Sequence, residues 1–115
     1  MHRGEIHVVN LDPARSGGAN KRRPAVIVSN DGANVSAERT GQGVVTVVPL
    51  TSNISRLHPF QVLLPARLTG LERDSKAQAE QVRSISVDRL GPAIGEIPQE
   101  LMAELDEALR LHLAL

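Results

Sequence analysis

Two short polar clusters in this 115-residue chain hold side chains that could act on a charged substrate. The cationic cluster is residues 21–23 (Lys-Arg-Arg), which ends at Pro24, and the hydroxyl cluster is residues 51–53 (Thr-Ser-Asn). A guanidinium can bind a phosphodiester through two hydrogen bonds, and a hydroxyl can add one directed hydrogen bond. Together these groups would suit the charged transition state of phosphodiester cleavage.

Each cluster lies at the end of an apolar run. Residues 25–28 (Ala-Val-Ile-Val) follow the cationic cluster, and residues 44–48 (Val-Val-Thr-Val-Val) precede the hydroxyl cluster. Short runs of this kind predict buried strands. Because strands that follow one another along the chain usually pair, the two clusters could meet at one end of a sheet. From these residues alone, a solvated cationic run and an ordinary turn are the more common interpretations.

Other familiar catalytic patterns are missing from the sequence. The four histidines, His2, His7, His58 and His112, have no partner at a metal-ligand spacing, and the chain has no cysteine. It also has no phosphate-cradling Gly-Lys-Ser/Thr motif and no nucleophile elbow. We therefore expect neither a metal site nor a cofactor.

Composition narrows the class of protein further. The length predicts a single domain over residues 1–115. The net charge of zero argues against a generic basic nucleic-acid binder, although residues 1–95 carry 12 Lys or Arg against 8 Asp or Glu. Phe60 is the single aromatic residue, so a nucleic-acid site would depend on arginines and backbone groups. The absence of cysteine and of a long apolar segment predicts a cytoplasmic protein with no membrane contact.

The order of short strands, loops and a single terminal helix predicts a small, mostly antiparallel barrel with one helix packed on it. This is an α+β fold that is mainly β. Strands are expected at residues 5–11 and 60–64, besides the two apolar runs, the second of which is expected to end at Pro49. Residues 98–113 carry an apolar stripe at helical spacing and predict a terminal helix. Turns or loops are expected at residues 12–22, 30–34, 37–43 and 70–74, and a helical turn at 87–90. The glycine-rich loop 12–22 is either a lid or a plain connection.

Several segments, in order along nearly the whole chain, resemble the MazF/PemK endoribonuclease toxins of bacterial type II toxin–antitoxin systems. They are residues 23–30 (Arg-Pro-Ala-Val-Ile-Val-Ser-Asn), 47–53 (Val-Val-Pro-Leu-Thr-Ser-Asn), 59–60 (Pro-Phe), 73–75 (Arg-Asp-Ser) and 80–84 (Glu-Gln-Val-Arg-Ser). The resemblance implies a MazF/CcdB-like, SH3-like barrel with a C-terminal helix. It also implies that residues 75–86, which are ambiguous by propensity, are largely strand.

The resemblance also implies roles for particular residues. Arg23 and Thr51 match the catalytic arginine and threonine of the family. Many relatives carry a glutamate in the first loop, but residues 17–19 read Gly-Gly-Ala here, which excludes a carboxylate base at that position. The residues expected to contact RNA are Lys21, Arg22, Ser52, Asn53, Arg56, Ser75, Gln81 and Arg83.

The function expected from this resemblance is sequence-selective cleavage of single-stranded messenger RNA. Without a metal site, the substrate's own 2′-hydroxyl is the simplest nucleophile. The expected partners are a cognate antitoxin and a second copy of the chain, with RNA lying across the homodimer interface. One alternative is a noncatalytic, CcdB-like toxin that binds a protein such as a topoisomerase, and another is an inactive remnant that only binds antitoxin.

Overall fold

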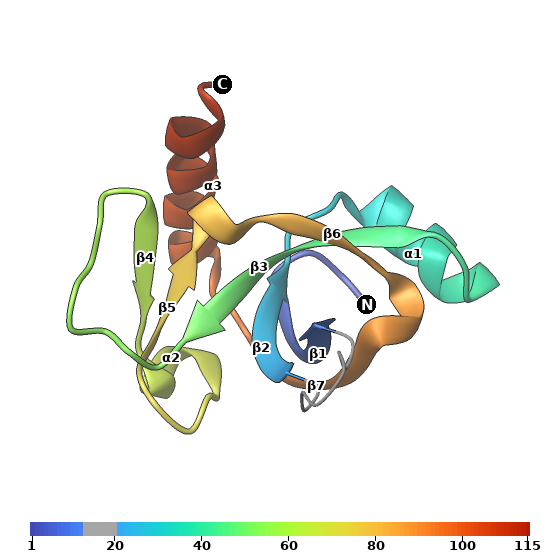
Figure 1. Ribbon diagram of the computed structural model, residues 1–115, viewed down its shortest axis with the longest axis horizontal. Coiled ribbons are helices and arrows are strands. Elements are labelled where there is room, and N and C mark those ends of the chain that lie inside the picture. Colours follow the sequence, from blue (N-terminus) through green and yellow to red (C-terminus); the bar gives the residue numbers. More distant parts are fainter. Residues whose placement is uncertain (13–20) are drawn as a thin grey trace.

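The fold is a strongly curved antiparallel sheet with a helix at the C-terminal end (Figure 1). The computed structural model describes residues 1–12 and 21–115. Within these residues the seven strands follow the order β4-β5-β3-β2-β1-β7, and β6 also pairs with β3. Every pairing is antiparallel, so the predicted mainly β architecture is confirmed. The strands are β1 (Glu5–Asp12), β2 (Lys21–Ile27), β3 (Val44–Thr51), β4 (Gln61–Leu64), β5 (Ser75–Gln78), β6 (Arg83–Ser86) and β7 (Leu90–Glu96).

Both faces of the central strands are buried. In β2, Val26 packs in one apolar cluster together with Leu105 of the terminal helix, α3 (Gln99–Leu113). Its neighbours Ala25 and Ile27 pack in a second cluster with Val47 of β3. Because side chains alternate between the faces of a strand, adjacent residues of β2 reach different cores. The prediction of a strand buried on both faces is therefore confirmed.

The terminal helix α3 agrees with the predicted residues 98–113 to within one residue at its start. Leu105 and Ala108 of its apolar stripe are buried, whereas Leu113 near its end is exposed. Arg3 fastens the helix to the sheet, since its Nη2 donates to Asp106 Oδ1 at 2.6 Å and its Nε donates to the carbonyl of Val28 at 2.8 Å. No helix in the described part of the chain is long and apolar enough to cross a membrane.

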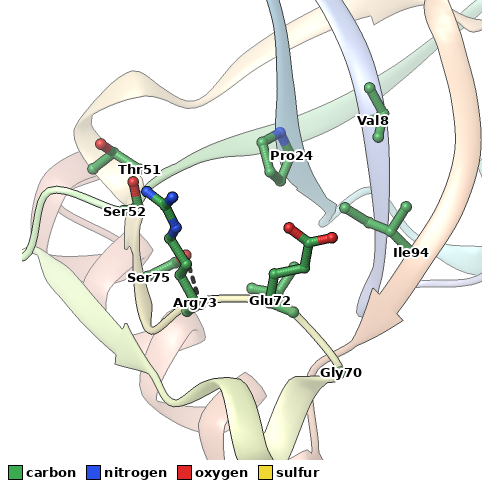
Figure 2. Close-up of a pocket in the computed structure, with 10 residues that line it drawn as sticks. Val8, Pro24, Thr51, Ser52, Gly70, Glu72, Arg73, Ser75 and Ile94 are labelled. Carbon is green, nitrogen blue, oxygen red and sulfur yellow. Dashed lines mark hydrogen bonds between the residues drawn. The ribbon is translucent and has the colours of Figure 1, made fainter.

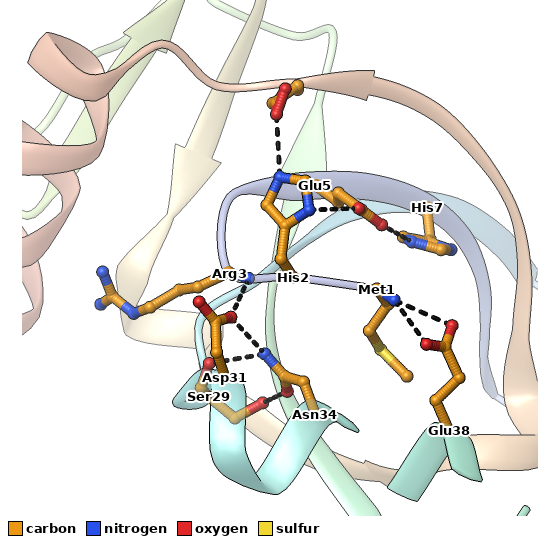
Figure 3. A network of polar contacts seen from close by, with 10 residues as sticks. Met1, His2, Arg3, Glu5, His7, Ser29, Asp31, Asn34 and Glu38 are labelled. Atoms are coloured by element: carbon orange, nitrogen blue, oxygen red, sulfur yellow. Dashed lines mark hydrogen bonds and ion pairs between the residues drawn. The ribbon is translucent and has the colours of Figure 1, made fainter. Parts of the chain in front are cut away.

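A polar network around the first residues joins β1 to β7 and to the first helix (Figure 3). His2 lies between Glu5, at 2.6 Å from its Nδ1, and Glu96, at 2.9 Å from its Nε2. The hydrogen bond with Glu96 raises the pKa of His2. The backbone N–H of Arg3 donates to Asp31 Oδ1 at 2.6 Å, which lowers the pKa of that carboxyl. His2 therefore has a structural role.

The turn and loop predicted at residues 30–34 and 37–43 are wrong, because α1 (Asp31–Thr40) occupies this stretch. Asn30 caps the helix by accepting a hydrogen bond from the N–H of Ala33 at 2.8 Å, and Gly41 ends it with φ of 67°. The buried residues of α1 are Asn34 and Ala37. Since this helix buries an amide and a methyl group, it lacks the apolar stripe that would reveal it in the sequence.

The prediction that Pro49 ends its strand is also wrong. Leu50 and Thr51 continue β3 by pairing with Ala77 and Lys76 of β5. Pro49 lies between the part of β3 that pairs with β6 and the part that pairs with β5. Its missing N–H therefore interrupts no ladder on that edge of β3.

Between β4 and the terminal helix, two predicted segments are confirmed and two further elements are present. Residues 75–86 are mostly strand, as the resemblance implied, with the 3₁₀ turn η1 (Ala79–Gln81) between β5 and β6. The helical turn expected at 87–90 is η2 (Val87–Arg89). The sequence predicts neither the short helix α2 (Ala66–Thr69) nor strand β7. In β7, Gly91 and Pro92 resemble a signal that ends an element.

Candidate active site

The C-terminal end of β3 borders a cavity of about 560 Å³, here called the β3-end cavity (Figure 2). One side of it carries hydroxyl groups and the other side is apolar, and two oppositely charged side chains project from the turn between α2 and β5. The lining residues are the hydroxyl-bearing Thr51, Ser52 and Ser75, the apolar Val8, Pro24, Leu71 and Ile94, the charged Glu72 and Arg73, and Gly70.

The two charged side chains, Arg73 and Glu72, point into different parts of the cavity. Arg73 directs its guanidinium toward Thr51 and Ser52, whereas the carboxylate of Glu72 points toward the side of Pro24 (Figure 2). Both charged residues are exposed to solvent. A cation beside two hydroxyls can bind phosphate oxygens, and these three groups lie in the part of the cavity that contains the end of β3.

Arg23 lies on the strand next to Thr51. The register between β2 and β3 pairs Ala25 with Pro49 and Val26 with Val48. The predicted pairing of consecutive strands is therefore confirmed, and the paired residues end at Ala25 and Pro49, two positions from Arg23 and from Thr51. Among the described residues that line the β3-end cavity, β2 contributes Pro24, and Arg23 is exposed beside it.

The other two members of the cationic cluster lie farther along β2. Arg22 is exposed and lines a second cavity, of about 230 Å³, together with Asn10 and Arg89. Val8 lines both cavities, so the second continues the first along β1. Lys21 is the first residue of β2, and its side chain lies outside the described part of the chain, as do residues 13–20 of the predicted lid.

The segment after the hydroxyl cluster is ordered by its own polar contacts. Asn53 Oδ1 accepts hydrogen bonds from the backbone N–H and the hydroxyl of Ser55, at 3.3 and 2.8 Å. The Nζ of buried Lys76 donates to the carbonyl of Arg56 at 2.6 Å. The ring of Phe60 stacks on His58 with their centroids 5.1 Å apart. One face of the single aromatic ring is therefore already covered.

Two of the predicted RNA contacts lie away from the cavity. Gln81 belongs to η1, and Arg83 belongs to β6 and pairs with Val47 of β3. Both side chains are exposed, on the edge of β3 opposite to β2. Of the ten predicted site residues, the structure thus gathers Thr51, Ser52 and Ser75 in one cavity and distributes the described others around it.

Sequence reasoning missed Glu72 and Arg73 as site residues. The charged turn predicted at residues 70–74 is present, but it faces the hydroxyl cluster. Asp74 Oδ1 accepts from the N–H of Ala66 at 2.8 Å, and the buried hydroxyl of Ser75 donates to the carbonyl of Arg73 at 3.2 Å. The signal in the sequence was the adjacency of these charges to Ser75.

Gly95 of β7 packs against the start of this turn, and its replacement is expected to destabilise the protein. A Cβ at residue 95 would lie 2.4 Å from the carbonyl oxygen of Thr69, which is backbone and cannot rotate away. Thr69 is itself buried, and its hydroxyl donates to the carbonyl of Pro65 at 3.1 Å. We expect Gly95→Ala to lower the free energy of unfolding by about 1–3 kcal/mol, measured by urea denaturation.

The matched control for Gly95→Ala is Ala93→Ser, on an exposed position of the same strand. This control should stay within about 0.5 kcal/mol of the wild type. If Gly95→Ala were as stable as the wild type, the turn could move to accept the added methyl group. The close contact between Gly95 and Thr69 would then not be what holds the turn that carries Glu72 and Arg73.

Known proteins of one family match nearly the whole chain. Residues 2–113 match the family described as PemK-like, MazF-like toxin of type II toxin-antitoxin system. The chain is 61% identical over 115 residues to Endoribonuclease MazF9 of Mycobacterium tuberculosis, an alignment that covers 100% of this chain and 98% of that protein.

Solved structures have the same fold. The Mycobacterium tuberculosis toxin MazF-mt6 superposes with a TM-score of 0.77 at 27% identity, covering 96% of this chain and 97% of its own. The structure titled MazE-MazF (Form-II) from Deinococcus radiodurans superposes with a TM-score of 0.72 at 27% identity, covering 100% and 96%.

Proposed function

This chain belongs to the PemK-like, MazF-like toxins of type II toxin-antitoxin systems, and from this premise we propose that it is an endoribonuclease that cleaves single-stranded RNA at selected sequences. The observation that carries the proposal is the arrangement at the end of β3. There Thr51 and Ser52 face the guanidinium of Arg73 (Figure 2), and the neighbouring strand β2 carries Arg23 two residues before Ala25, which pairs with Pro49.

The proposed reaction uses the 2′-hydroxyl of the substrate as nucleophile. Its oxygen forms a bond to the neighbouring phosphorus, its proton is released, and the bond from phosphorus to the 5′-oxygen breaks. The 5′-oxygen leaves as a hydroxyl after taking up a proton. Arg23 binds the nonbridging oxygens, whose negative charge grows in the transition state, and the hydroxyl of Thr51 donates a further hydrogen bond to the phosphate.

The donor set of the site favours this route over water attack assisted by a metal ion. Among residues 1–12 and 21–115, no three His, Cys, Asp or Glu side chains gather as metal ligands would. The exposed cations at and beside this cavity, Arg73 and Arg23, are arginines, which suit phosphate binding. The proposed reaction therefore takes its charge stabilisation from side chains, and it should proceed in EDTA.

The RNA strand is proposed to extend from the cavity over neighbouring cations and polar groups of a homodimer. Arg22 and Arg56 would bind flanking phosphates, and Asn53, Gln81 and Arg83 would contact flanking nucleotides. Pairing two copies would lengthen a short cationic groove without lengthening the chain. Sedimentation at micromolar concentration should give a dimer, and a monomer at that concentration would contradict this part of the proposal.

The cognate antitoxin is proposed to cover the same groove. Because the groove binds RNA through arginines, an acidic segment that is disordered in isolation could compete for them while covering a large surface. Such an antitoxin should abolish RNA cleavage at an equimolar ratio. Full cleavage in the stoichiometric complex would place the antitoxin elsewhere.

The experiment that tests the function is cleavage of a pool of random single-stranded RNA by the purified protein in EDTA, followed by sequencing of the new 5′ ends. Enrichment of one short motif is expected, and the same motif held in a duplex should be resistant. The absence of cleavage in either EDTA or Mg²⁺, by a folded protein that still binds its antitoxin, would favour the noncatalytic alternatives.

A further inference from the structure

The proposed chemistry leaves one charged group of the β3-end cavity without a role. Thr51, Ser52 and the guanidinium of Arg73 lie on the hydroxyl side, but the carboxylate of Glu72 points into the other part of the cavity (Figure 2). That part is lined by the apolar side chains of Val8, Pro24 and Ile94. A carboxylate repels phosphate. If Glu72 contacts RNA, it must therefore contact a group that donates hydrogen bonds to it.

The turn that carries Glu72 is fixed at both ends, which suits a group that selects its ligand. Gly70 adopts φ of 82° and its N–H donates to the carbonyl of Ala66 at 3.0 Å. On the other side, Asp74 accepts from the same residue's N–H and Ser75 bonds back to Arg73. These bonds hold the backbone of the turn, and so the place from which the Glu72 side chain starts, relative to the hydroxyl cluster.

The two charged side chains point into different parts of the cavity, as partners of the phosphate and of the base of one nucleotide would. Arg73 faces the hydroxyls, where a phosphate would bind, and Glu72 is its neighbour in sequence with the side chain directed to the apolar part. An apolar slot can hold the faces of a planar base, as Pro24 and Ile94 could here, while a polar group at its end reads the edge of that base.

An ionised carboxylate accepts hydrogen bonds and donates none. On the Watson–Crick edge, guanine presents two adjacent donors, N1–H and the 2-amino group, which match the two carboxylate oxygens. Adenine, cytosine and uracil each present an acceptor next to their donor, which a carboxylate would repel. We propose that Glu72 selects a guanine in a nucleotide flanking the cleaved linkage. This inference rests on the proposed function and adds a specificity residue to it.

The test begins with the motif found by sequencing the 5′ ends, which should contain a guanine flanking the cleaved linkage. That guanine is then replaced by inosine, which keeps N1–H but lacks the 2-amino group. The wild type should cleave the inosine substrate about tenfold less efficiently, because one hydrogen bond to a charged group is lost. Glu72→Gln should lose most of its preference for guanine and should treat guanine and inosine alike. The control Glu100→Gln, on the exposed start of α3, should behave as the wild type.

Binding of uncleavable 2′-O-methyl strands, followed by fluorescence polarisation, separates this inference from the proposed function. If the protein cleaves nothing, the preference for guanine over inosine and its loss in Glu72→Gln can still be measured as affinities. A preferred motif without a flanking guanine would overturn the inference. A uniform loss of rate in Glu72→Gln on all sequences, with unchanged preference, would also overturn it and would assign Glu72 to proton transfer.

Discussion

Replacing Arg23 with alanine should lower kcat/KM for RNA cleavage by about 10²- to 10³-fold, because in the proposed reaction this cation stabilises the transition state. Most of the loss should appear in kcat, since the charge on the phosphate grows as the 2′-oxygen attacks. Arg23→Lys should recover only part of the rate, because an ammonium cannot bind two phosphate oxygens as a guanidinium does. The measurement is steady-state cleavage of one defined oligoribonucleotide.

Thr51→Ala belongs to the same prediction and should lower kcat by at least about tenfold, with partial rescue by Thr51→Ser. Arg39→Ala is the control for loss of a positive charge, because Arg39 is exposed on α1 and lines neither of the two cavities described above. Circular dichroism would establish that each variant is folded. Rates within a few-fold of the wild type for both Arg23→Ala and Thr51→Ala would show that the catalytic assignment is wrong.

A substrate with a 2′-deoxy nucleotide at the cleaved linkage should not be cleaved, which is the largest effect expected. Removing the 2′-hydroxyl removes the nucleophile, while the charge and geometry of the phosphate are retained. The rate should fall by more than about 10³-fold, because the proposed reaction has no nucleophile other than the 2′-hydroxyl. The measurement is gel analysis of a chimeric strand with a single deoxynucleotide.

The position of the substitution provides the control for this experiment. A deoxynucleotide placed several residues away from the cleaved linkage should leave the rate nearly unchanged. The modified strand should also bind and act as a competitive inhibitor of cleavage of the unmodified strand. Cleavage of the modified linkage itself would require a nucleophile other than the 2′-hydroxyl, such as water activated by a metal ion.

The sequence predicts the strands of this fold better than its helices and connections. The runs around Val26 and Val47 are β-branched and lie between two cores, so hydrophobicity alone identifies them. Helix α1 escapes the same reasoning because its buried side includes Asn34, whose Nδ2 donates to the carbonyl of Ser29 at 2.8 Å. This local hydrogen bond satisfies a buried amide, and hydrophobic periodicity carries no signal of a polar residue on the buried side.

Only part of the candidate site can be predicted from the sequence. Reasoning from consecutive strands predicts the pairing of β2 with β3, which puts Arg23 and Thr51 on neighbouring strands. Arg73 could not be placed so, because its position depends on how α2 and Gly95 fix the turn before β5. Charges on a surface turn have no periodic pattern, so only the fold reveals that this turn faces the end of β3.

The most direct test of the central claim is the chemistry of the product ends after cleavage in EDTA. Attack by the 2′-hydroxyl leaves a 2′,3′-cyclic phosphate, or the 3′-phosphate formed when it opens, on the upstream fragment, and a 5′-hydroxyl on the downstream fragment. Mass spectrometry of both fragments should find these groups, and a kinase should label the downstream fragment without prior phosphatase treatment. A 5′-phosphate on the downstream fragment, or no cleavage until Mg²⁺ is added, would contradict the account.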